Sequence, residues 1–439
     1  MPKTLKRLGI LLFIALIVSG CSAVPSSKEQ GQSSQETKLD WNKQAPDTKG
    51  KTITVLWQPG EWKAGVLKDF TKKTGIKVKQ IQVNYGALYN KITTAAMSNS
   101  SDIDLVEMDT IWTGQFYKGG IVQELTSAMP ENVRNQFTSS SINSLTNDGH
   151  VMAVPFFSST KHFYWNNELL KKAGIDAPPT TWTEFKEDSL KLKAKGIVAS
   201  GWSWQQAESL ICDYVAFVKS FGGEFFDQNG KPTFNKGGGL QALQFMVDLY
   251  NTDKTVMPAS LQWNENNVTD AFSAGKIAMM TNWEGQYPGL NDPSNSKVAG
   301  KTDMGLIPGE GSVKSASVTG TAGLAMMKNS KNKGAAFELV KFIASKGYQI
   351  PQFTQDGWYP SVEGLFNDPE IVKADKTGTI GKISEQYKYG VDRPSAPGYV
   401  NWSDILAGEL HSALRKEKTP EEALNSAVEK IEKVMEENK

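Results

Sequence analysis

Aromatic side chains follow the ends of several predicted strands, in three of four cases together with an acidic side chain. The groups are residues 57–61 with Trp57 and Glu61, residues 84–85 with Tyr85, residues 109–112 with Asp109 and Trp112, and residues 282–285 with Trp283 and Glu284. An aromatic ring covers an apolar face of a ligand, and a carboxylate accepts hydroxyl protons through charge-assisted hydrogen bonds. The pattern indicates noncovalent binding of a small molecule.

Motifs for other chemistry are largely missing from the sequence. It contains no phosphate loop and no Gly-x-Ser-x-Gly elbow, and His150, His162 and His411 lack metal-ligand spacing. The glycines at 237–239 lack dinucleotide spacing and predict a helix start instead. An Asp-x-Asn-Gly at 227–230 lacks the later ligands of a calcium loop, so a turn is predicted there. Carboxylate pairs are common enough that a glycoside hydrolase remains an alternative.

Strands and helices must alternate to place these groups. Residues 53–57, 76–83 and 105–108 are predicted strands, and residues 66–70 and 88–97 are predicted helices, with Gly75 ending the first helix. Such alternation predicts a parallel, doubly wound sheet, in which ligands bind beyond the carboxyl ends of the strands.

The later sequence shows similar signals. Capping boxes at 181–184 and 419–422 predict the starts of two helices. Residues 197–199 and 277–280 are predicted strands, and a helical face is predicted at 243–250.

Size and charge narrow the class of protein. A chain of 439 residues is long enough for two domains plus tails. Its 48 basic and 47 acidic residues nearly cancel, so no nucleic-acid partner is expected.

The N-terminus predicts the compartment. Basic residues precede an apolar run at 8–18 that is too short to span a bilayer, so residues 1–20 are predicted to be a signal peptide. Val18, Ser19 and Gly20 before Cys21 resemble the lipobox of bacterial lipoproteins, which implies lipidation of Cys21, with palmitate as one acyl chain. Polar residues 21–47 predict a flexible tether. Cys212 is predicted to be a buried thiol without a disulfide.

Across nearly all of the chain after the tether, the sequence resembles family 1 extracellular solute-binding proteins, the sugar receptors of ABC importers, especially their maltose- and trehalose-type members. The matching stretches are 104–109 with Trp112, Gln115 and Phe116, then 153–156, 164–170, 178–185, 271–279, the strand at Gly320, 335–338, and Arg393 with Pro394.

The resemblance implies an α/β, two-lobe periplasmic-binding-protein-like fold of type II, joined by hinge crossovers. The N-terminal lobe would comprise 48–157 and 309–345, and the C-terminal lobe 158–308 and 346–439. Hinges are expected near Phe157, Pro308 and Lys346. The implied function is capture of a sugar, a disaccharide or oligosaccharide, and its delivery to the membrane permease subunits of an ABC transporter.

The resemblance also implies site residues. Glu61 and Asp109 would accept sugar hydroxyls, Trp283 would stack on the sugar, and Arg393 would donate hydrogen bonds. Trp358 and Tyr359 would line the cleft, and Gly320 would let the sugar approach the backbone.

Two positions depart from the family pattern. Residues 158–160 are Ser-Ser-Thr where an acid is common, and Ala322 stands where some relatives have a stacking Trp. A roomier cleft for an oligosaccharide is therefore expected. We expect a monomer without cofactor, metal or catalytic activity, anchored at the extracytoplasmic face of the cell membrane. A binding protein for a non-sugar solute, such as a polyol or peptide, is the other alternative.

Overall fold

The computed structural model describes residues 39–58, 64–394 and 398–438. The first part contains β1 (Thr52–Trp57), α1 (Ala64–Thr74), β2 (Lys77–Gln82), α2 (Tyr85–Met97), β3 (Leu105–Asp109), η1 (Thr110–Trp112), α3 (Thr113–Lys118), α4 (Glu131–Arg134), α5 (Ser139–Ser144), β4 (Thr146–Asn147), β5 (His150–Val151) and β6 (Val154–Phe157). The middle part contains β7 (Lys161–Asn166), α6 (Asn167–Lys172), α7 (Trp182–Ala194), α8 (Glu208–Ser220), α9 (Gly237–Val247), η2 (Asp248–Thr252), η3 (Pro258–Gln262), α10 (Glu265–Ser273), β8 (Met279–Trp283), η4 (Glu284–Gln286), α11 (Tyr287–Leu290) and β9 (Thr302–Gly305).

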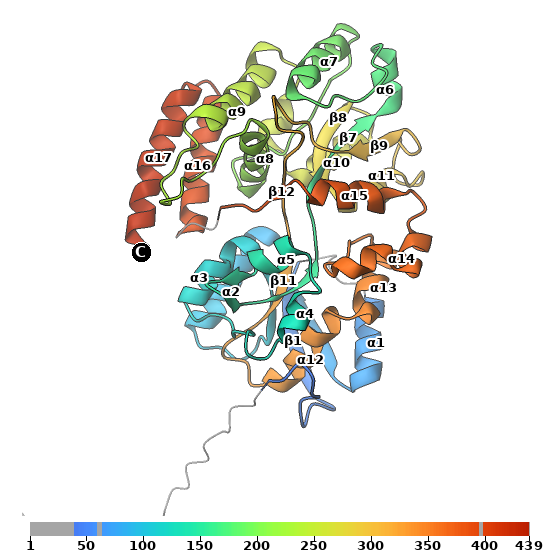
Figure 1. The fold of residues 1–439 in the computed structure, drawn as a ribbon, viewed down its shortest axis with the longest axis vertical. Helices are drawn as coiled ribbons and strands as arrows, with labels where there is room; N and C mark the ends of the chain where they lie inside the picture. The colour runs from blue at the N-terminus through green and yellow to red at the C-terminus, as the bar shows by residue number, and fades with distance from the viewer. Residues whose placement is uncertain (1–38, 59–63, 395–397, 439) are drawn as a thin grey trace, which may run out of the picture. The chain divides into compact units, whose positions relative to one another are not determined.

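The last part contains β10 (Ser317–Val318), β11 (Ala322–Met326), α12 (Lys333–Ile343), α13 (Lys346–Asp356), η5 (Glu363–Asn367), α14 (Pro369–Ala374), α15 (Thr379–Tyr387), β12 (Gly390–Val391), α16 (Tyr399–Leu414) and α17 (Pro420–Glu437). Figure 1 shows α16 and α17 side by side, packed against α9.

The first sheet has the strand order β2-β1-β3-β11-β6. The pairs β1–β2 and β1–β3 are parallel, which confirms the prediction for this part of the chain, whereas β11 runs antiparallel to both of its neighbours. Alternate residues of a strand face opposite sides of a sheet. Val55 and Trp57 accordingly pack with α1 and α12 on one face, and Leu56 packs with α2 on the other. Helices therefore cover both faces of the first sheet.

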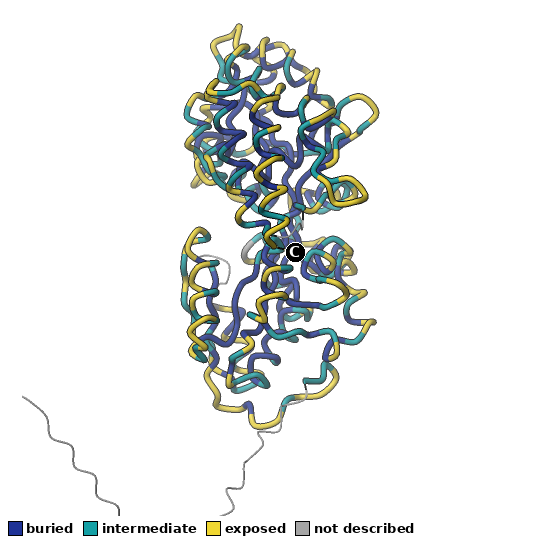
Figure 2. The backbone as a smooth tube through the Cα atoms, turned by 90° about the vertical axis from the view of Figure 1, so that its left-hand side faces the viewer, coloured by how far each residue is buried: buried dark blue, intermediate teal, exposed yellow. Residues whose placement is uncertain are grey.

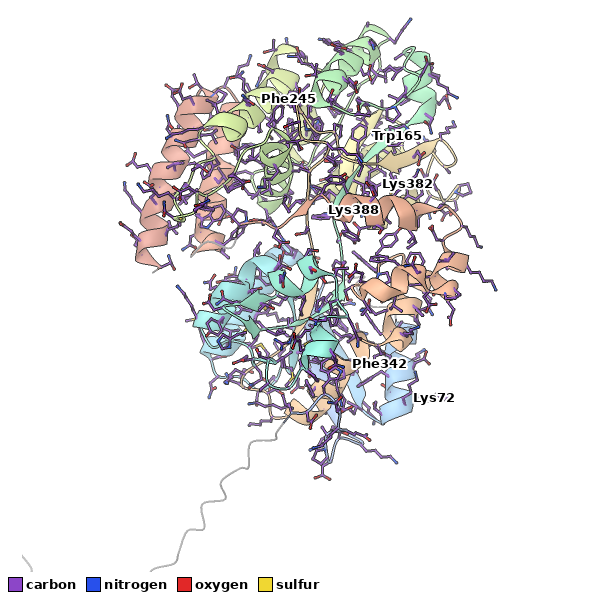
Figure 3. All side chains as sticks on the ribbon, viewed as in Figure 1. Lys72, Trp165, Phe245, Phe342, Lys382 and Lys388 are labelled. Carbon is purple, nitrogen blue, oxygen red and sulfur yellow. The ribbon has the colours of Figure 1, made fainter. Side chains whose placement is uncertain are left out.

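The second sheet is three-stranded and antiparallel, with the order β8-β7-β9. Its faces also alternate: Phe163 and Trp165 of β7 belong to a core shared with α7, α8, α9, α16 and α17, while Tyr164 faces a second core with α10 and α15. Phe245 packs against the core that contains Trp165, and both residues are labelled in Figure 3. Figure 2 shows buried residues in the interior of the fold and exposed residues along its outer segments.

The structure confirms the elements predicted from local patterns, with two exceptions. Residues 197–199, predicted to be a strand, form no regular strand. Their carbonyls at Val198 and Ala199 accept hydrogen bonds from Ala278 and Met279, but ladder contacts extend only to a bridge at Ser200. The strand predicted at 277–280 begins later, as β8, and ends at Trp283. Both capping boxes are present, at the starts of α7 and α17.

Two smaller predictions are also confirmed. Cys212 is a buried free thiol on α8, and burial raises its pKa. The Asp227 carboxylate accepts hydrogen bonds from the backbone of Asn229 and Lys231, so the acid caps the predicted turn.

The chain passes between the two sheets three times: after β6, between β9 and β11, and after α12. These passages lie beside the expected hinges, although the lobe boundaries stay a prediction. Helix α13 serves both regions, because Tyr348 lies in the core of the first sheet and Ile350 and Phe353 lie in a core of the second. Folded packing begins inside the expected tether, where the Trp41 ring lies edge-on to Phe337 at 5.7 Å between centroids.

The glycines at the start of α9 allow a close backbone approach. A Cβ on Gly239 would lie 2.0 Å from the carbonyl oxygen of Phe234. We predict that Gly239→Ala lowers the free energy of unfolding by about 1–3 kcal/mol, a cost typical of overpacking. Gly86→Ala in α2 is the control, since no atom lies within 4 Å of its added Cβ. Equal denaturant midpoints for the two variants would contradict the prediction.

Candidate functional site

Trp283 ends β8 with its indole partly exposed. Lys161 of β7 is its direct cross-strand partner, so the two side chains share one face of the sheet. The Lys161 ammonium lies 5.4 Å from the centroid of the indole, within the range of a cation–π contact. A Cβ on Gly320 would lie 2.4 Å from the Trp283 ring, so glycine at this position makes room for the indole. The expected approach of a sugar to the Gly320 backbone stays a prediction.

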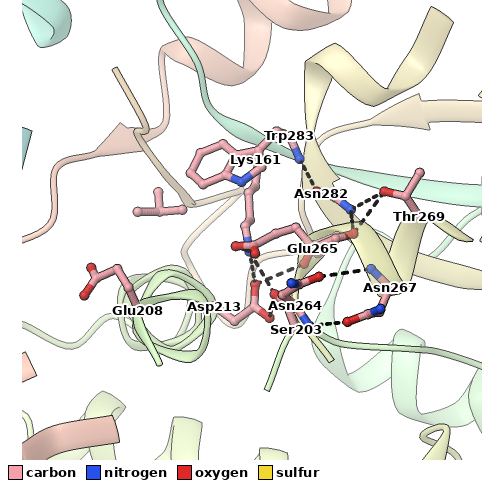
Figure 4. Close-up of polar contacts among 12 residues, drawn as sticks. Lys161, Ser203, Glu208, Asp213, Asn264, Glu265, Asn267, Thr269, Asn282 and Trp283 are labelled. Carbon is pink, nitrogen blue, oxygen red and sulfur yellow. Dashed lines mark hydrogen bonds and ion pairs between the residues drawn. The ribbon is translucent and has the colours of Figure 1, made fainter. Parts of the chain in front are cut away.

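Lys161 has no exposed side-chain surface. Its Nζ donates to Asp213 Oδ1 at 2.7 Å and to Ser203 Oγ at 3.1 Å, and Glu265 Oε1 lies 3.5 Å away. Burial lowers the pKa of Lys161, but the charges of Asp213 and Glu265 outweigh it, and the net shift is upward. The lysine is therefore a buried cation held by two carboxylates (Figure 4).

Asp109 ends β3 on the first sheet. Its Oδ1 accepts a hydrogen bond from the Ile111 backbone and so caps η1, and its Oδ2 accepts one from the Tyr85 hydroxyl at 2.8 Å. Arg393 Nη2 also donates to Oδ1, at 2.6 Å. Asp109 thus has structural partners, and its expected binding role stays a prediction.

Arg393 joins both regions of the fold. Its Nη1 donates to Glu208 Oε1 of α8 at 3.0 Å, while its Nη2 holds Asp109, and its side chain is only 4% exposed. Tyr399 donates a second hydrogen bond to Glu208 Oε1 at 2.6 Å. Burial raises the pKa of Glu208, although the Arg393 charge opposes this shift. Arg393 is expected to donate to the sugar and Asp109 to accept from it, and in the structure these two side chains contact each other.

The other expected residues differ in placement. Trp358 is partly exposed and packs on Phe157, with 4.6 Å between ring centroids. Tyr359 is a core side chain, 2% exposed, whose hydroxyl contacts Thr379 Oγ1, so its expected place in the cleft lining stays a prediction. Glu61 lies outside the described residues.

Sequence reasoning did not assign roles to Lys161, Glu208, Glu265 or Glu284. The available signal was a charged residue beside an apolar run, as at Lys161 before residues 163–165, and an acid directly after Trp283. These signals do not reveal a partner that is distant in the sequence.

Glu284 is buried next to the first passage between the sheets. It accepts hydrogen bonds from the Ser159 hydroxyl and the Thr160 amide, both at 3.0 Å, and from the Tyr387 hydroxyl at 3.1 Å. Burial raises its pKa to about 7, against these three hydrogen bonds. Residues 158–160 contain no acid themselves, but Glu284, which follows the end of β8, places its carboxylate against Ser159 and Thr160.

Three further observations concern the described residues. No group of three or more His, Cys, Asp or Glu side chains among them could hold a metal ion. No helix among them has the length and apolar character required to cross a bilayer. A surface pocket lined by Lys193, Tyr250, Lys254 and Lys416, among others, includes none of the expected binding residues.

Comparisons with known proteins agree on one family. Residues 57–350 match the family model described as "Bacterial extracellular solute-binding protein". A "Probable ABC transporter-binding protein" of Deinococcus radiodurans is 29% identical over 376 residues, covering 81% of this chain and 86% of the relative.

Solved structures agree as well. A maltose-bound T. maritima protein is 26% identical with a TM-score of 0.79, covering 87% of this chain and 99% of that one. An ABC transporter solute-binding protein of Agrobacterium radiobacter K84 in complex with ribitol is 25% identical with a TM-score of 0.77, covering 87% and 98%. The expected two-lobe α/β fold of type II is confirmed by these neighbours.

Glu284 should make stability depend on pH. Its pKa is 4.5 ordinarily and about 7 in the fold, so the folded state binds more protons between these values. This contribution to the free energy of unfolding, on the order of 3 kcal/mol, is full below about pH 4.5 and is lost as the pH rises through about 7. We predict that Glu284→Gln flattens the fall in stability between about pH 5 and pH 8, measured by denaturant unfolding.

Burial lowers the pKa of His162 to about 4, so His162 changes stability with pH in the direction opposite to Glu284. Because wild type and Glu284→Gln both contain His162, its effect cancels when the two proteins are compared. The exposed Glu187→Gln on α7 is the control and should keep the wild-type pH dependence. The same dependence in Glu284→Gln as in wild type would exclude this role for Glu284.

Proposed function

The chain belongs to the bacterial extracellular solute-binding proteins, and we propose that it captures a sugar, a disaccharide or oligosaccharide, for the permease of an ABC transporter. The observation that carries the sugar assignment is the partly exposed indole of Trp283, fixed in place at a strand end. Maltose and ribitol are bound by two structural relatives, and both are polyhydroxylated.

A pyranose has an apolar face and a rim of hydroxyls. An aromatic ring covers the face at little cost in conformational entropy, because it has only two side-chain torsions to fix. The Lys161 ammonium and the Gly320 backbone restrain the Trp283 ring further. The carboxylates of Asp109 and Glu208 are 15% and 17% exposed, so each keeps some surface through which a hydroxyl hydrogen bond could form.

Small side chains support a ligand larger than a monosaccharide. Ser159 and Thr160 occupy positions where an acid is common in the family, and both contact Glu284. Ala322 of β11 replaces a stacking Trp of some relatives. Glu284 fills the space beside Ser159 and Thr160, so the side-chain volume that is missing at Ala322 is what leaves more room for additional sugar units.

Binding without turnover is the second element of the proposal. The family model and the relatives reported above are described as binding or solute-binding proteins. Delivery requires release of an unchanged sugar to the permease, so hydrolysis would defeat the function. We propose that the protein acts as a monomer.

The third element is an anchor at the extracytoplasmic face of the membrane. The lipobox at residues 18–21 and the signal peptide support acylation of Cys21, and both lie outside the described residues. A lipid on Cys21 would hold the receptor near its permease through the tether.

Truncation of the proposed platform should separate binding from folding. We predict that Trp283→Ala weakens binding of the tightest sugar in a panel of maltose, maltotriose and ribitol by about thirtyfold, or about 2 kcal/mol, as buried aromatic anchors do. Calorimetric titration measures the affinity, and thermal melting of the empty protein measures stability. Trp41→Ala, on the first-sheet side, is the control.

A large loss of melting temperature with unchanged affinity would assign Trp283 to the core instead. Asp109→Asn is a poorer probe, because removing its charge also leaves the buried Arg393 with one carboxylate fewer.

The anchor makes a separate prediction. Cys21→Ala in the producing bacterium should move the protein from the membrane fraction to the soluble fraction, because no acyl chain can then be attached. Cys212→Ala is the control and should remain with the membrane, since Cys212 is buried in α8. Immunoblotting of the two fractions measures where the protein is. Equal membrane retention of wild type and Cys21→Ala would contradict the proposal.

A further inference from the structure

Glu265 is held at a fixed place beside Trp283. Asn264 and Asn267 form a capping box that makes Glu265 the first residue of α10. Asn282, the neighbour of Trp283, donates from Nδ2 to the Glu265 carbonyl oxygen at 3.0 Å. The start of α10 is therefore tied to the strand end that carries the indole (Figure 4).

The Glu265 side chain is the solvent-facing member of a buried ion cluster. Its Oε1 lies 3.5 Å from Lys161 Nζ, and the same Nζ lies 5.4 Å from the centroid of the Trp283 ring. Side-chain exposure is 22% for Glu265, against 0% for Lys161 and 1% for Asp213. Of the three ionic side chains, Glu265 is the one that a ligand on the indole could reach.

Glu265 also has unused capacity to accept hydrogen bonds. Asp213 and Ser203 already contact the Lys161 ammonium at 2.7 and 3.1 Å, which is closer than Glu265. Among the described residues, no donor contacts the second carboxylate oxygen of Glu265. Two carboxylates face one ammonium, so the cluster has a surplus of negative charge at its exposed end.

We propose that Glu265 contacts the ligand directly, by accepting hydroxyl hydrogen bonds from the sugar that stacks on Trp283. The proposal rests on the sugar-binding function proposed above and narrows its ligand class. A neutral polyhydroxylated sugar gains charge-assisted hydrogen bonds from the Glu265 carboxylate. A sugar acid meets the surplus negative charge at this position and is disfavoured.

The test compares two charge removals on one helix. Glu265→Gln should weaken binding of the tightest neutral sugar among maltose, maltotriose and ribitol by about tenfold, through loss of a charged acceptor. Asp270→Asn, an exposed acid on α10, should bind as wild type does. In wild type, the same sugar with a carboxylate in place of one primary hydroxyl should bind more weakly, and Glu265→Gln should narrow this difference.

A further variant separates ligand contact from support of Lys161. Glu265→Asp keeps the charge near the ammonium but withdraws the carboxylate by one methylene group. It should retain the wild-type melting temperature and still bind the neutral sugar weakly. Wild-type affinity in this variant would show that the charge matters only for the ion cluster, and the proposal would be wrong.

The remaining outcomes are distinct. If wild type binds none of the neutral sugars, the proposed function fails and this inference fails with it. If wild type binds but Glu265→Gln and Asp270→Asn have the same affinity, only the inference about Glu265 is overturned.

Discussion

A lysine ammonium without exposed surface is the constraint around which the second sheet is arranged. Moving such a charge out of water costs several kcal/mol unless opposite charge and hydrogen bonds compensate for it. Lys161 meets this requirement with Asp213 of α8 and with Ser203, and Thr281 of β8 contacts the same Asp213 carboxylate. One buried charge therefore fixes a helix against two strands. Because the ammonium also faces the indole, the position of Trp283 depends on it.

Arg393 applies the same rule between the regions built on the two sheets. Its guanidinium contacts Asp109 at the end of β3 and Glu208 at the start of α8, and it is almost fully buried. Each buried cation therefore contacts two carboxylates, and each pair of carboxylates includes at least one side chain that is partly exposed. The cations hold the surrounding elements in place, while at least one carboxylate of each pair keeps some exposed surface.

Local patterns were enough to predict β1, β2, β3, α7 and α17, because their signals lie within a few residues of one another. The segment at 197–199 has an apolar strand pattern, but in the fold its pairing is reduced to single bridges at Ser200. Site contacts were beyond reach for a related reason. Lys161 and Asp213 are 52 residues apart, and Asp109 and Arg393 are 284 apart, so their pairing depends on the complete fold. Family resemblance named Asp109, Trp283 and Arg393 but could not reveal these contacts.

The position of β11 has a consequence for the order of folding. This strand lies between β3 and β6 in the first sheet, yet it follows all three strands of the second sheet in the sequence. Synthesis proceeds from the N-terminus, so β3 and β6 are made long before the strand that joins them. Pairing across such a separation is slow, because a long loop must close first. The first sheet is therefore completed only after every strand of the second sheet has been synthesised, so the second sheet can pair its strands while the first still lacks the strand between β3 and β6.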